Sequence, residues 1–176
     1  MGVLVASHIA SGVLALALGL IVLLRPKGGR LHRGLGYAYT AAMLVLNGTA
    51  FGIYKVFGTF GPFHVLAVIC LVSLALGVVA AIRRRSGWRR RHYNWMSWSY
   101  IGLLAATSAE VALRVPAIQS TGAFGFALIF ILPAVVVFVG RQFLVRNRNR
   151  LAPHPVGEST PTGTGYNGGN RGRADE

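Results

Sequence analysis

Five long runs of apolar residues dominate the pattern of this chain. They cover residues 3–24, 34–57, 63–82, 95–113 and 122–140. None of them shows the polar face, recurring every 3.6 residues, that marks a helix on the surface of a soluble protein. Each is long enough to cross the apolar core of a bilayer, which takes a helix of roughly 20 residues. The pattern predicts an all-α integral membrane protein with five transmembrane helices.

Positive charge is concentrated in the segments that separate or follow these runs. The cations are Arg25, Lys27, Arg30 and Arg33, then Arg83, Arg84, Arg85, Arg89, Arg90 and Arg91, and finally Arg141, Arg146, Arg148 and Arg150. Because cationic loops stay on the cytoplasmic side, we expect the N-terminus outside and the C-terminus in the cytoplasm. Residues 1–150 form the predicted transmembrane domain. Residues 151–176, rich in Gly, Pro, Thr and Asn, are expected to be a disordered cytoplasmic tail.

Acidic residues are scarce, so the chain has a large net positive charge. The chain has 18 Lys and Arg against four Asp and Glu, which gives a net charge of +14. Such a charge can indicate nucleic-acid binding. Here nearly every cation lies beside a predicted span, so we expect contacts with the bilayer and its anionic lipid headgroups, and none with nucleic acid. Glu110 is the single carboxylate side chain before residue 151.

Four histidines lie at the ends of the first four predicted helices, one on each helix. His8 and His64 are expected near the outer face, and His32 and His92 near the cytoplasmic face. The first four helices are expected to form a bundle, with the fifth beside it. Alternate helices of a bundle face each other across its centre, where facing side chains hold cofactors. The pattern suits two bis-histidine haem b sites, one near each face, through which an electron crosses the membrane.

The same residues allow other interpretations. Glu110 is predicted at about the depth of His8, and its spacing from Arg114 suits an ion pair along one helix. With His8 and His64 it would form an open site for a divalent metal, or a proton relay in a transporter. Asn47 adds a polar amide near the middle of the second helix. A third alternative is a cofactor-free structural or assembly protein, in which His32 and His92 are solvated at the membrane interface.

Short segments around these residues resemble a known family. The segments are HIASGVLAL (8–16), HRGLGYAY (32–39), FHVLAV (63–68), HYNWMSWSYIGLLAA (92–106) and AEVALR (109–114). They are similar to the bacterial membrane family catalogued as domain of unknown function 2306. The resemblance implies a multi-pass protein of the bacterial inner membrane and brings no established activity. The placement of the four histidines alone is also similar to that in cytochrome b561, which holds two haems; no catalytic motif is recognised.

Overall fold

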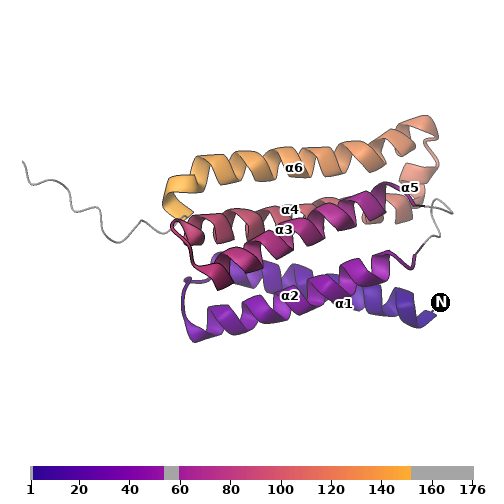
Figure 1. The fold of residues 1–176 in the computed structure, drawn as a ribbon. Coiled ribbons are helices and arrows are strands. Elements are labelled where there is room, and N and C mark those ends of the chain that lie inside the picture. The colour runs from indigo at the N-terminus through magenta and orange to yellow at the C-terminus, as the bar shows by residue number, and fades with distance from the viewer. Residues whose placement is uncertain (1, 54–59, 152–176) are drawn as a thin grey trace, which may run out of the picture.

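The computed structural model describes residues 2–53 and 60–151, and their regular structure is entirely helical. The helices are α1 (Gly2–Leu24), α2 (Arg30–Ala50), α3 (Pro62–Arg83), α4 (Trp88–Arg114), the short α5 (Pro116–Gln119) and α6 (Ala123–Leu151). The five long helices run side by side and alternate in direction along the chain (Figure 1). The predicted all-α fold is therefore confirmed.

Three of the helices are long and apolar enough to cross a membrane: α1, α3 and, over Ala123–Arg146, α6. Large apolar side chains on these helices lie exposed at the surface of the bundle, among them Val13, Ile69 and Phe138. Within the described residues α2 and α4 do not meet the same criterion, because arginines, tyrosines and small polar residues interrupt their apolar sequence. Three helices thus have the length and apolar character of a membrane span, while five spans and their orientation stay predictions.

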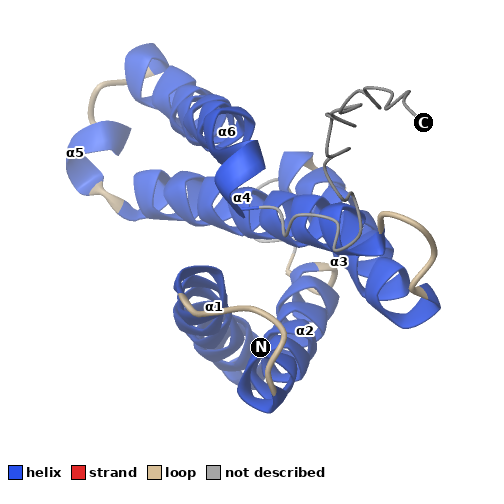
Figure 2. Ribbon diagram, turned by 90° about the vertical axis from the view of Figure 1, so that its left-hand side faces the viewer, coloured by secondary structure: helices blue, strands red, loops and turns tan. Residues whose placement is uncertain are grey.

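The first four helices form two antiparallel hairpins that pack against each other. α1 pairs with α2 and α3 pairs with α4, and the hairpins meet through α2 with α3 and α1 with α4. Over the described ranges no close backbone contact joins α1 to α3 or α2 to α4, so these two pairs lie diagonally across the bundle. α6 packs on α4, on the side away from α1 and α2 (Figures 1 and 2).

Two tyrosines fill the middle of the bundle, where a glycine makes room for them. A Cβ on Gly19 would overlap the ring of Tyr100 and approach that of Tyr39 to 3.0 Å. The Tyr100 hydroxyl donates to the carbonyl of Leu16 at 3.1 Å, and the Tyr39 hydroxyl lies 2.9 Å from Oγ of Ser99. This packed layer separates the two ends of the bundle, each of which carries one pair of histidines.

The helices are longer than predicted at the arginine-rich ends. α2 begins at Arg30 rather than residue 34, α4 begins at Trp88 rather than residue 95, and α6 continues to Leu151. Arginine favours helices, and its long side chain keeps the guanidinium in water beside a membrane. α2 ends at Ala50, short of the predicted residue 57. Residues 54–59 and the predicted tail beyond Leu151 lie outside the described residues.

Candidate functional site

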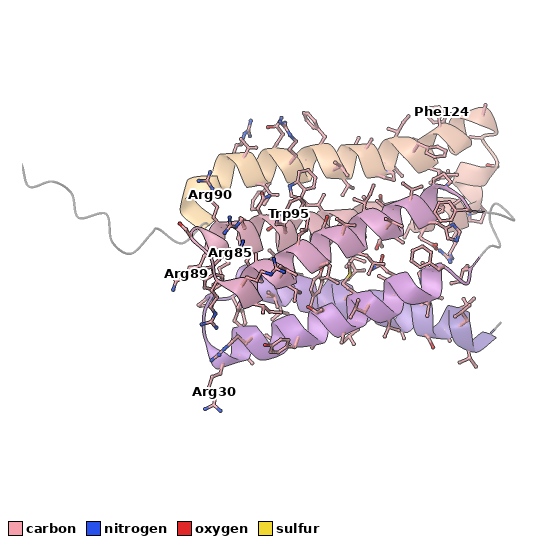
Figure 3. The ribbon with its side chains drawn as sticks, viewed as in Figure 1. Arg30, Arg85, Arg89, Arg90, Trp95 and Phe124 are labelled. Atoms are coloured by element: carbon pink, nitrogen blue, oxygen red, sulfur yellow. The ribbon has the colours of Figure 1, made fainter. Side chains whose placement is uncertain are left out.

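The bundle has one end rich in arginine, which we call the basic end, and an opposite end. The basic end carries the α1–α2 and α3–α4 links, and Arg30, Arg85 and Arg89 lie there (Figure 3). Phe124, at the start of α6, lies at the opposite end. The four histidines of the sequence analysis divide accordingly, two to each end, and each pair comes from helices that face each other diagonally.

His32 on α2 and His92 on α4 are in direct contact at the basic end. Their ring centroids are 6.5 Å apart and the ring planes are nearly perpendicular, at 83°. Nδ1 of His92 lies 2.8 Å from the carbonyl oxygen of Gly77 on α3. Because a carbonyl can only accept, Nδ1 of His92 donates, and neutral His92 keeps its lone pair on Nε2. The ring of Trp88 lies 6.5 Å from that of His92.

His32 is the less constrained member of this pair. Its Nδ1 is buried and has no hydrogen-bond partner among the residues that the structure describes. His32 precedes the apolar part of α2 and so lies outside the membrane-crossing helices. Burial, followed by the nearby His92 and Lys27, lowers the pKa of His32 below its usual value. At neutral pH the imidazole is therefore neutral, which is the form that binds a metal ion.

A cavity of about 340 Å³ opens between α1, α2, α3 and α4 at the opposite end. Its polar lining comprises His8, Asn47, Thr107, His64, Glu110 and Arg114. Apolar side chains such as Val13 and Leu66 complete the wall. The fold thus brings to one cavity all the polar residues that the sequence analysis placed near the outer face, together with Asn47. The volume falls at the lower end of the range typical of small-molecule sites, roughly 300–1,000 Å³.

His8 is oriented by α2. Its Nδ1 lies 3.1 Å from the carbonyl oxygen of Leu46 and 3.1 Å from Oγ1 of Thr49. The carbonyl makes Nδ1 the donor, so the lone pair of neutral His8 is on Nε2. A histidine that binds a metal through Nε2 commonly donates its other N–H to a backbone carbonyl in this way. His8 and His92 therefore share the same tautomer.

His64 has a structural role that the sequence analysis missed. Nδ1 of His64 accepts a hydrogen bond from the backbone N–H of Gly61 at 3.1 Å, at the start of α3. Neutral His64 therefore carries its proton on Nε2, the reverse of His8. The ring stacks on Phe60, with centroids 5.0 Å apart. Gly61 followed by Pro62, with His64 at the third helical position, is the signal that could have revealed this cap.

Glu110 and Arg114 form an ion pair along α4, as their spacing predicts. The pair lies at the rim of the cavity, with the Glu110 side chain 31% exposed and that of Arg114 59% exposed. Asn47 is buried and its side-chain amide donates to the carbonyl of Met43 at 2.7 Å, along its own helix. Over residues 2–53 and 60–151, no group of three His, Cys, Asp or Glu side chains is close enough to hold a metal ion.

Residues 5–146 match the family described as "Predicted membrane protein (DUF2306)". The chain belongs to this family. The match includes both histidine pairs, the cavity and most of each long helix. The family description agrees with the three helices that are long and apolar enough to cross a membrane, and it assigns no activity. No curated protein and no solved structure matches the chain, so the likeness to cytochrome b561 has no support from these comparisons.

Proposed function

We propose that this membrane protein carries electrons by means of a haem b held between His32 and His92 at the basic end. The proposal rests on one observation, the contact of these two rings across a diagonal of the bundle at a centroid distance of 6.5 Å. Bonds from a metal to imidazole nitrogen are about 2 Å long, so two imidazoles on opposite sides of one metal have ring centres roughly 6 Å apart. The separation of the two histidines fits this requirement.

The surroundings of the pair are also compatible with a ligated haem. The hydrogen bond from His92 Nδ1 to Gly77 leaves Nε2 available and fixes the ring orientation. Gly36 follows His32 by one helical turn, and a Cβ added there would meet no atom within 4 Å. Arg33 and Arg91 adjoin the two histidines in sequence and would supply cations for the haem propionates.

A haem at this position would take up and release one electron at a time. Three features of the chain would help it to hold such a haem. Burial lowers the pKa of His32 and so favours its neutral form, the carbonyl of Gly77 orients His92, and the ring of Trp88 lies beside that of His92.

The opposite-end pair fits a haem less well, so the proposal concerns the basic end. His64 Nδ1 accepts from Gly61, and its Nε2 therefore carries the proton. Ligation through Nε2 would require His64 to exchange its tautomer and give up the cap of α3. The second haem on His8 and His64, expected from the sequence, stays a prediction that the haem stoichiometry tests.

The test is the absorption spectrum of the full chain, purified in detergent from haem-replete cells. We expect a Soret band, a sharp α band after reduction with dithionite, and one haem per chain by the pyridine haemochrome assay. Two haems per chain would extend the proposal to His8 and His64. A colourless, folded protein would refute it.

A second candidate function is favoured by the cavity at the opposite end. His8 presents an Nε2 lone pair and Glu110 is the only carboxylate in the described chain, and both line this cavity. Such groups would accept and release protons during proton-coupled transport. Proton entry into vesicles that contain the protein and a trapped pH dye would test this. Flux under an imposed potential should fall in Glu110→Gln, and flux equal to that of protein-free vesicles would exclude the function.

A further inference from the structure

A groove of about 410 Å³ lies between α4 and α6 near the basic end, and its lining includes no histidine and no residue of the cavity. Three arginines line it, Arg90 and Arg91 from α4 and Arg141 from α6, together with Trp95 and Trp98. Trp95 lies on the side of α4 that faces α6 (Figure 3). Cationic and aromatic side chains are therefore gathered in one concave surface.

The arginines of this groove have no carboxylate available from the described part of the chain. Glu110 is the only acidic residue there, and it pairs with Arg114 at the opposite end. Arg91 uses one nitrogen to donate to the carbonyl of Ser86 at 2.6 Å, which is a neutral acceptor. Within the described residues, no carboxylate side chain balances the positive charge of the groove. Arginine binds phosphate oxygens with paired hydrogen bonds, so the groove suits a phosphate group.

The position of the groove indicates which molecule would supply that phosphate. α6 is one of the three helices long and apolar enough to cross a membrane, and Arg141 lies near the basic end of its apolar segment. Towards the middle of the helix the groove is closed, because Gly140 brings α6 so near α4 that an added Cβ would lie 2.8 Å from Ile101. Tryptophan rings concentrate at the level of lipid headgroups. The groove therefore lies where the phosphates of surrounding lipids are found.

We propose that this groove binds the headgroup of an anionic phospholipid, with the phosphate between Arg90 and Arg141. Basic pockets between transmembrane helices are known to hold such headgroups. This proposal is more specific than a general attraction of the basic end for anionic lipids, because it places the lipid phosphate between two particular arginines. Arg30 and Arg89 lie at the same end but do not line the groove (Figure 3).

The experiment is native mass spectrometry of the full chain in detergent, with phosphatidylglycerol or phosphatidylcholine of matched acyl chains added. We expect phosphatidylglycerol to bind about tenfold more tightly than phosphatidylcholine. The double variant Arg90→Gln with Arg141→Gln should lose about tenfold in this affinity. The matched control, Arg30→Gln with Arg89→Gln, removes the same charge and should bind as the unchanged protein does. All four side chains are exposed, so both double variants are expected to keep the melting temperature of the unchanged protein.

Three outcomes would overturn the proposal. Equal loss in the two double variants would assign the binding to surface charge in general. Equal affinity for the two lipids would show that the groove does not recognise an anionic headgroup. Displacement of phosphatidylglycerol by millimolar inorganic phosphate would identify a site for free phosphate instead. None of these measurements depends on haem, so they can fail or succeed apart from the electron-transfer proposal.

Discussion

His92 on α4 contacts His32 on α2 with ring centroids 6.5 Å apart, and the same His92 donates through Nδ1 to the carbonyl of Gly77 on α3. One side chain thus links three helices at the basic end. The hydrogen bond to Gly77 determines which ring nitrogen of His92 remains available, and it directs that nitrogen away from α3. This relationship makes the basic-end pair the strongest candidate for a ligand-binding site.

Replacing His92 by alanine removes one proposed haem ligand and the hydrogen bond to Gly77. We expect the reduced α band of the purified protein to be lost, because a bis-histidine haem needs both rings. His8→Ala is the matched control, since His8 has the same tautomer but lies at the opposite end, and its variant should keep the band. If His8→Ala loses the band and His92→Ala retains it, the haem site has been assigned to the wrong end.

Replacing His64 by alanine removes the cap of α3. The backbone N–H of Gly61 would lose its acceptor, and we expect a loss of about 1 kcal/mol in the free energy of unfolding, as for other helix caps. His64→Gln should retain most of the stability, because a glutamine side chain at this position can accept the same hydrogen bond. Thermal unfolding in detergent measures the stability of both variants. Equal destabilisation by the two variants would argue against a capping role.

Replacing Gly19 by alanine tests the packed layer between the two ends. The added Cβ would overlap the ring of Tyr100, so we expect a destabilisation of about 1–3 kcal/mol, typical of overpacking in a core. Gly48→Ala is the control, because a Cβ on Gly48 in α2 meets no atom within 4 Å. The control should melt at or slightly above the temperature of the unchanged protein, since alanine favours the helix. Equal melting temperatures for the two variants would contradict the close packing of Tyr100 against Gly19.

Replacing Glu110 by glutamine should separate stability from function. The ion pair with Arg114 is partly exposed, and such pairs contribute roughly 0–1 kcal/mol, so we expect little change in thermal unfolding. The proton flux proposed for the opposite-end cavity should nevertheless fall. Arg114→Gln breaks the same pair without removing the carboxylate and serves as the control. A large loss of stability in Glu110→Gln would mean that the carboxylate is structural.

Parts of the site that depend on neighbours along one helix could be predicted from the sequence. The ion pair between Glu110 and Arg114 follows from their spacing on α4, and it is present. The cap by His64 involves only residues 61–64, so the spacing of Gly61, Pro62 and His64 contains all the information needed to predict it. α4 begins at Trp88, ahead of its apolar run, because a helix can extend through arginines whose guanidinium groups stay in water.

The sequence by itself determined the long helices, because length and apolar character are properties of a continuous segment. It also determined that positive charge is concentrated at one end of the bundle. The tertiary structure decided how the helices are rotated about their axes. That rotation follows from contacts between distant residues, such as Gly19 with the ring of Tyr100, which no single helix contains. It decided that His32 and His92 touch and that His8, His64 and Glu110 line one cavity. It also decided, through the hydrogen bond between α1 and α2, which nitrogen of His8 carries the proton.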